Sequence, residues 1–165
     1  MPTLPTDRSR VRRAATTVVV CAVALGVCFP AWAQTAEVPY WASLTANRVN
    51  MRVGPARNYN IAWVYRRDGL PLRVIRVHQG WRMVEDPDGA KGWVLARFLS
   101  RSRTALVTGR VAELREEPGE GRLRWRVEPG VVGLLGDCRA GWCELDAAGH
   151  KGWIRADAIW GEGKP

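Results

Sequence analysis

Histidine and cysteine, the residues that most often bind metals or act as nucleophiles, are scarce in this sequence. The chain of 165 residues has two histidines, His78 and His150, and four cysteines. A structural zinc site takes four ligands, mostly Cys and His, and no group of these residues supplies them. We therefore expect neither a metal site nor a bound cofactor.

Acidic pairs suited to acid–base catalysis are also missing. Asp86 and Asp88, and likewise Glu116 and Glu117, lie among turn-forming residues. Such positions lack the shielded surroundings that raise the pKa of a carboxyl group for catalysis. The sequence therefore predicts that the protein is not an enzyme.

The sequence has one markedly apolar run, and it lies near the N-terminus. Residues 14–29 carry no charge, follow four arginines between positions 8 and 13, and precede Ala31-Trp32-Ala33. A basic start, a short apolar stretch and small residues at the exit are typical of an export signal. We therefore predict a signal peptide over Met1–Ala33, cleaved after Ala33, and a periplasmic or secreted protein.

Two other interpretations of this segment are less well supported. An uncleaved membrane anchor needs roughly 20 apolar residues, which is more than this run provides. A lipoprotein cleavage site before Cys28 calls for a small residue where Val27 stands. We expect no membrane span in the mature chain.

The mature chain is a degenerate duplication. Three pairs of matching residues lie 63, 61 and 60 positions apart: Met51 and Leu114, Trp81 and Trp142, Trp93 and Trp153. A period of this length, with small shifts from loop insertions, indicates two small domains and not a solenoid, whose repeats are usually about 20–50 residues long.

Each repeat has an all-β pattern. Residues 61–65 and 72–77 are rich in β-branched and aromatic side chains, which strands favour. Turn-forming pairs such as Asp68-Gly69 and Pro129-Gly130 separate the short segments. Helical turns are expected only within 95–99 and 155–159. About five short strands in a repeat of ~55 residues predict a small, strongly bent barrel.

The ordered motifs of the first repeat resemble those of the bacterial SH3-like domain family. They are Asn50-x-Arg52-x-Gly54-Pro55, Gly69-x-x-Leu72-x-Val74, Gly80-Trp81-x-x-Val84 and Gly89-x-x-Gly92-Trp93-Val94. The second repeat diverges, with Glu113 in place of Asn50 and Glu117 in place of Gly54.

The resemblance implies two tandem SH3-like barrels. We place them at residues 42–99 and 107–162, joined by a linker over 100–106 and preceded by a short lead over 34–41.

Each repeat has a Gly-Trp pair, Gly80-Trp81 or Gly141-Trp142, at a predicted hairpin turn. We expect Gly80 and Gly141 to need a positive φ, which glycine adopts at little cost. The tryptophans that follow, and Trp93 in the last strand, are either core residues that stabilise a very small barrel or part of a ligand surface.

Other aromatic residues follow the long first loop, in the region that lines a groove in SH3-like barrels. Aromatic side chains there can stack on a sugar or hold an extended peptide, although one of them can equally be core. The candidate ligand-binding residues are Arg57, Tyr59, Trp63, Tyr65, Trp81 and Trp93.

Charge is distributed unevenly between the repeats. Residues 42–99 contain ten Lys or Arg and four Asp or Glu, whereas residues 107–162 contain eight and ten. Arg48, Arg57, Arg66 and Arg67 are among the candidates for a basic surface, which is either a solvated face or an attraction for an anionic partner. Export separates the protein from nucleic acid.

Cys138 and Cys143 flank a predicted hairpin turn in the second repeat. Cysteines on opposite arms of a hairpin come close enough to be bridged, and an exported protein meets an oxidising compartment. A redox-active pair usually has two intervening residues and a helix N-terminus, and neither is present. We predict a structural disulfide.

Two functions from different classes remain. The first is an exported, non-catalytic binding module that recognises a peptidoglycan fragment or an extended peptide in the periplasm. The second is an assembly protein whose barrels pack with each other or with an envelope protein and bind no small ligand.

Overall fold

The computed structural model describes residues 37–165. The predicted signal peptide, Met1–Ala33, and the first residues of the lead segment lie outside this described part. Among residues 37–165, no helix is long and apolar enough to cross a membrane.

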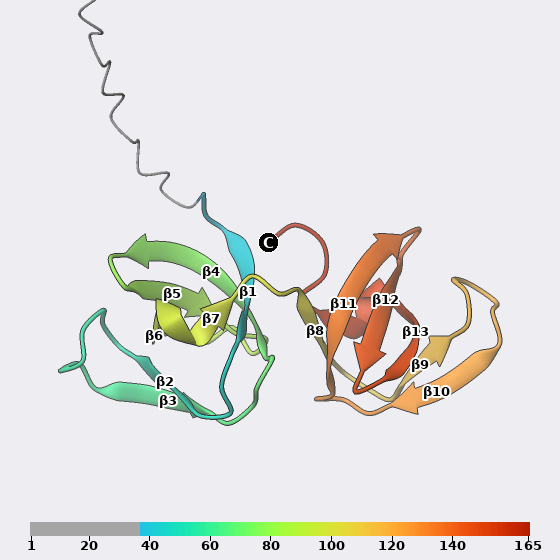
Figure 1. Cartoon of the computed structure of the whole chain (residues 1–165), viewed down its shortest axis with the longest axis horizontal. Helices are drawn as coiled ribbons and strands as arrows, with labels where there is room; N and C mark the ends of the chain where they lie inside the picture. The colour runs from blue at the N-terminus through green and yellow to red at the C-terminus, as the bar shows by residue number, and fades with distance from the viewer. Residues whose placement is uncertain (1–36) are drawn as a thin grey trace, which may run out of the picture. The chain divides into compact units, whose positions relative to one another are not determined.

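The first repeat folds into one antiparallel sheet of seven strands with the order β3-β2-β6-β5-β4-β1-β7 (Figure 1). The strands are β1 (Tyr40–Leu44), β2 (Val49–Arg52), β3 (Ile61–Tyr65), β4 (Pro71–His78), β5 (Trp81–Glu85), β6 (Lys91–Leu95) and β7 (Leu99–Ser100). Strand β1 pairs with both β4 and β7, so the chain end of the repeat returns to its beginning and the sheet curls round its core.

The second repeat forms a second sheet with the corresponding order, β10-β9-β13-β12-β11-β8-β14. Its strands are β8 (Thr104–Val107), β9 (Ala112–Arg115), β10 (Leu123–Val127), β11 (Val132–Arg139), β12 (Trp142–Ala147), β13 (His150–Arg155) and β14 (Ile159–Trp160). The identical strand order confirms the predicted all-β duplication.

Each sheet encloses its own apolar core. In β2, Val49 and Met51 are buried while the residues between and after them are partly exposed, as strand alternation requires. In β9, Ala112 and Leu114 take the same places in the second core. The cores are separate clusters of about ten buried residues each.

The two predicted helical turns are present as single 3₁₀ turns. They are η1 (Ala96–Phe98) and η2 (Ala156–Ala158), each directly after the last long strand of its sheet. The strands extend beyond the predicted domain limits, because β1 begins at Tyr40 and β8 at Thr104.

The expected positive φ at Gly80 was wrong. At the β4–β5 turn the residue with positive φ is Gln79, at 47°. At the corresponding β11–β12 turn both Ala140, at φ 49°, and Gly141, at φ 77°, have positive φ. A Cβ atom at Gly80 would have no atom within 4 Å. In the β4–β5 turn the left-handed conformation therefore falls on Gln79, one residue before the glycine that we expected to adopt it.

Candidate functional site

A pocket of about 430 Å³ lies on the first barrel. Four arginines and a tryptophan are prominent in its lining, which consists of Arg48, Asn50, Arg52, Arg57, Trp81, Leu95, Arg97 and Phe98. We call it the arginine pocket.

Three parts of the chain supply most of the polar lining of this pocket. Strand β2 contributes Asn50 and Arg52, which alternate with the buried Val49 and Met51 and so lie on the opposite face. The loop after β2 contributes Arg57, and η1 contributes Arg97.

Apolar side chains form the other part of the lining. Trp81, only 8% exposed, pairs across the β5–β6 ladder with Leu95. Phe98 lies beside them, and the Arg97 guanidinium stands 4.8 Å from the centre of its ring, a cation–π distance.

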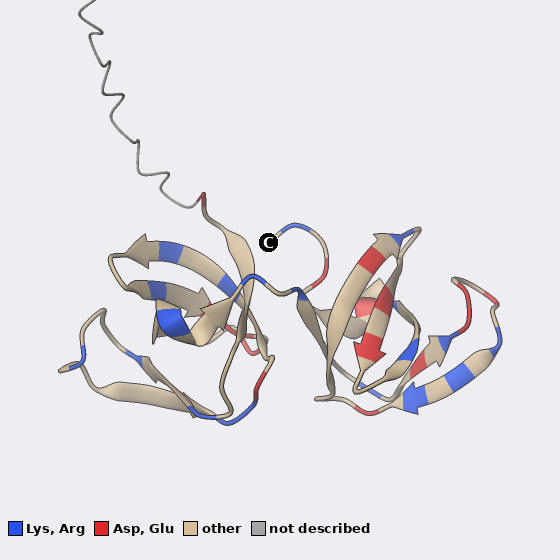
Figure 2. Ribbon diagram, in the orientation of Figure 1, with Lys and Arg blue, Asp and Glu red and all other residues tan. Residues whose placement is uncertain are grey.

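The positive charge of the arginine pocket is uncompensated. Its lining contains no carboxylate, and none of its four arginines forms an ion pair with an acidic side chain anywhere in residues 37–165. Figure 2 shows the wider setting, with Lys and Arg more frequent than Asp and Glu along the first sheet. Such a pocket attracts anions, and the guanidinium fork matches a carboxylate.

One arginine is held in place by the loop that follows β2. Arg52 donates from Nη1 to the carbonyl oxygen of Tyr59 at 2.6 Å. The Tyr59 ring packs on Gly54, where a Cβ atom would stand 2.6 Å from the ring carbons. The Asn-x-Arg-x-Gly-Pro motif and Tyr59 thus shape the loop that carries Arg57.

The structure brings together only part of the predicted site. Arg57 and Trp81 line the arginine pocket, and Tyr59, which is 47% exposed, borders it through its bond with Arg52. Trp63 lies outside it, on edge strand β3, and is 59% exposed. Trp93 also lies outside, half-buried, with its ring edge-on to His78 at 6.2 Å.

Tyr65 belongs to the first core. It is 4% exposed, and its hydroxyl donates to Oδ2 of Asp86 at 3.1 Å. Burial raises the pKa of this phenol far above its ordinary value, and the Asp86 charge and hydrogen bond add to the effect. Among the three candidates after the first loop, Tyr65 is therefore the core residue.

Sequence reasoning did not select Asn50, Arg52, Arg97 or Phe98 as binding residues. The alternation of β2 carries a signal for Asn50 and Arg52, because both stand opposite buried apolar residues. Nothing local marks Arg97, which reaches the pocket only because η1 folds beside β2 and β5.

The second barrel has the same fold but not the same pocket charge. At the matching positions, Glu113 replaces Asn50 and Asp157 replaces Arg97. The arginines there are neutralised: Arg115 contacts Glu113 at 2.5 Å, and Arg155 contacts Asp157 at 2.6 Å. Hydrogen bonding from Arg155 lowers the pKa of Asp157. A cluster of arginines without acidic partners is therefore specific to the first barrel. It is not a general feature of the fold, since the second barrel lacks it.

Neither a metal cluster nor a free thiol pair is found in residues 37–165. No group of three or more His, Cys, Asp or Glu in this part of the chain is arranged to hold a metal ion. Cys138 and Cys143 are direct cross-strand partners and are joined by a disulfide with a Cα–Cα distance of 4.0 Å.

Comparison with known proteins identifies both repeats. The sequence model of the bacterial SH3 domain matches residues 45–101 and again residues 109–161. No curated protein matches the chain.

This chain spans about half the length of the solved structures to which it has some similarity. NlpC2 from Trichomonas vaginalis is 17% identical with a TM-score of 0.35, over 76% of this chain and 49% of its own. NlpC1 from the same organism is 16% identical with a TM-score of 0.35, over 78% and 48%. An NlpC/P60 family protein from Bacillus cereus ATCC 10987 is 13% identical with a TM-score of 0.34, over 73% and 55%.

Proposed function

Because this chain belongs to the bacterial SH3 domain family, we propose that it is a non-catalytic, cell-wall-associated binding module. Its first barrel binds a carboxylate-bearing ligand in the arginine pocket. The ligand is a peptidoglycan fragment or an extended peptide, met in the periplasm or outside the cell after removal of the predicted signal peptide.

One observation carries the proposal: four arginines line a single pocket that contains no carboxylate. Some arginines elsewhere in residues 37–165 are neutralised by ion pairs, as Arg73 is by Glu85. Unpaired arginines repel one another, so a cluster of them is stabilised when an anion binds between them. A carboxylate accepts two parallel hydrogen bonds from one guanidinium.

The apolar part of the lining supports a ligand larger than a simple ion. Trp81, Leu95 and Phe98 offer a surface against which a sugar ring or an aliphatic side chain can pack. A pocket that combines charge with aromatic surface recognises an acidic group attached to an apolar or sugar body.

Retention on peptidoglycan sacculi tests this function. Residues 34–165, which form one compact unit, are mixed with sacculi at low salt and at about 0.5 M salt, where exposed charges are screened within a few ångströms. We expect retention at low salt, and about tenfold weaker binding after Arg57→Gln together with Arg97→Gln, since each change removes a charged hydrogen-bond donor.

The matched control removes the same charge from the second barrel. Arg110 and Arg126 are exposed, and Arg110→Gln together with Arg126→Gln should leave retention within about twofold, because exposed charges far from a site contribute little. Equal losses in the two double variants would contradict the arginine pocket. Absence of retention at low salt would contradict the binding function and favour the assembly role.

A further inference from the structure

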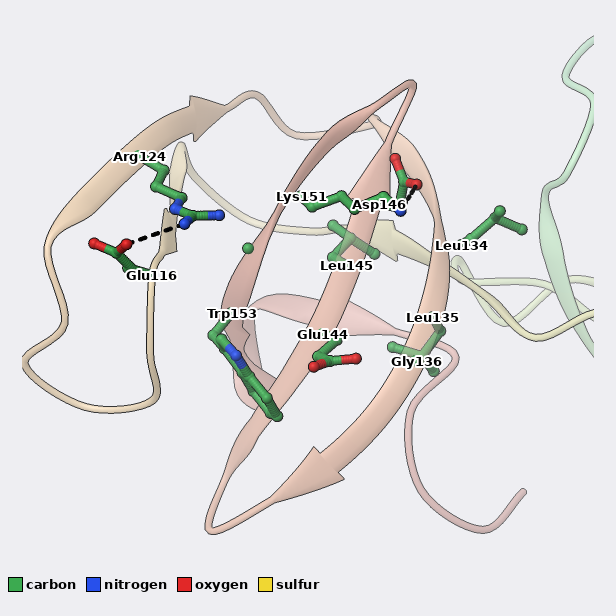
Figure 3. A pocket seen from close by; sticks show the side chains of 11 residues that line it. Glu116, Arg124, Leu134, Leu135, Gly136, Glu144, Leu145, Asp146, Lys151 and Trp153 are labelled. Atoms are coloured by element: carbon green, nitrogen blue, oxygen red, sulfur yellow. Dashed lines mark hydrogen bonds and ion pairs between the residues drawn. The ribbon is translucent and has the colours of Figure 1, made fainter.

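A second pocket, of about 410 Å³, lies on the second barrel (Figure 3). The β9–β10 region and strands β11, β12 and β13 supply its lining, in which Leu134, Glu144, Leu145 and Trp153 are prominent. We call it the β12 pocket. It shares no residue with the arginine pocket.

Apolar side chains form one side of the β12 pocket. Leu145 is fully buried below it, and Leu134 stands 58% exposed at its edge. Trp153, 8% exposed, forms a wall, and the Arg139 guanidinium stands 4.4 Å from its ring centre. The indole is therefore already engaged by a cation, and it acts as a rigid apolar surface.

Glu144 is the carboxylate of this pocket that has no basic partner. Glu116 is paired with Arg124 at 3.1 Å, and Asp146 with Lys151 at 3.5 Å. Glu144 is exposed, and its carboxylate forms no ion pair within residues 37–165. It lies directly across the ladder from Trp153, so the two side chains share one face.

The first barrel shows why this pocket is open. Arg73 stands at the position that corresponds to Leu134, and it donates from Nε and Nη2 to Oε2 of Glu85. The corresponding ladder pair in the second barrel is Leu134 with Asp146. With leucine in place of arginine, this ion pair cannot form, and the surface that it covers in the first barrel is free in the second.

A glycine makes room for the unpaired carboxylate. Gly136 stands where the first barrel has Ile75, and a Cβ atom there would lie 2.9 Å from Oε2 of Glu144. The open surface and the free carboxylate therefore depend on Leu134 and Gly136 in strand β11, together with Glu144 in β12, where the first barrel has Met83.

From this geometry we propose that the β12 pocket binds a lysine-type side chain of a peptide. The ammonium group forms a charge-assisted hydrogen bond with Glu144. The four-carbon stem packs on Leu134 and the Trp153 wall, as lysine stems do on apolar surfaces. The site is independent of the arginine pocket, since it lies on the other barrel and takes the opposite charge.

Nuclear magnetic resonance titration of residues 34–165 tests the proposal with small probes. We expect Nα-acetyl-lysine methylamide to shift the Trp153 indole N–H and the Gly136 amide signals in a saturable way. The norleucine analogue, which keeps the stem and lacks the ammonium, should bind about tenfold more weakly, in line with the worth of a hydrogen bond to a charged group.

Two variants and one control separate the site from general charge effects. Glu144→Gln should weaken the lysine probe about tenfold, and Leu134→Arg, which restores the residue of the first barrel, should abolish the shifts. Leu134 is exposed, so this change leaves the core intact. Glu120→Gln removes an exposed carboxylate outside the pocket and should change nothing.

Several outcomes would overturn the proposal. Equal binding of the lysine and norleucine probes would show an apolar pocket without amine recognition. Equal weakening by Glu144→Gln and Glu120→Gln would show that the lysine probe responds only to the net charge of the barrel and not to Glu144. An absence of saturable shifts with folded wild-type protein would show that the β12 pocket does not bind the lysine probe. None of these results would bear on retention through the arginine pocket.

Discussion

The hydroxyl of Tyr65 donates a hydrogen bond to the buried carboxylate of Asp86 at 3.1 Å, which ties β3 to the turn after β5. The other Asp86 oxygen accepts from the backbone N–H groups of Asp88 and Ala90. This carboxylate is thus satisfied from two sides, and the tyrosine closes the network.

Replacing Tyr65 by Phe should lower the free energy of unfolding by about 1–3 kcal/mol, because the Asp86 oxygen loses its side-chain donor while still buried. Chemical denaturation at neutral pH measures this loss. An unchanged free energy of unfolding would show that the hydrogen bond contributes nothing net.

The same pair predicts a pH dependence. The pKa of Tyr65 is raised in the folded state, so its contribution to stability is complete below the unfolded pKa of about 10 and is lost as pH rises above it. The difference in unfolding free energy between wild type and Tyr65→Phe should therefore shrink from pH 8 to pH 11. A constant difference would contradict the raised pKa.

Gly92 sits where strand β6 passes closest to β2. A Cβ atom there would lie 2.5 Å from Cγ of Met51 and 2.9 Å from the backbone oxygen of Arg52. We expect Gly92→Ala to cost about 1–3 kcal/mol of unfolding free energy through overpacking, measured by thermal or urea unfolding. Gly80→Ala is the control, since a Cβ atom there meets nothing within 4 Å, and a similar loss in both would refute the steric explanation.

The Cys138–Cys143 disulfide gives a thiol count that is simple to check. Protein of residues 34–165, unfolded without reductant, should show no free thiol, and full labelling of both cysteines would contradict the bridge. Reduction should lower the unfolding free energy by about 2 kcal/mol, the small effect expected for a short loop.

Trp63 tests whether the exposed face of β3 takes part in binding. It is 59% exposed, so Trp63→Ala should change the unfolding free energy by less than about 0.5 kcal/mol. If this face belongs to the ligand groove, the variant loses retention on sacculi. Retention equal to wild type would confine binding to the arginine pocket. Tyr59→Ala is not an equivalent test of binding, because the Tyr59 ring also packs on Gly54 and its removal affects the structure of the loop.

The β pattern, the duplication and the cysteine pair are properties that the sequence determines by itself. Each depends on neighbouring residues: alternation of period two in β2, the turn pairs such as Asp68-Gly69, and cysteines flanking one hairpin turn. Local patterns of this kind persist in any fold that uses them, which is why strands and 3₁₀ turns were found near their predicted places.

The tertiary structure alone decided which side chains meet. Arg48 and Arg97 are almost 50 residues apart in the chain and line one pocket only because the sheet curls and brings η1 to β2. Curling likewise buries Tyr65 and leaves Trp63 on the surface, two positions away on the same strand. A sequence of aromatic and basic residues does not specify such long-range contacts, since they depend on how a whole sheet closes round its core.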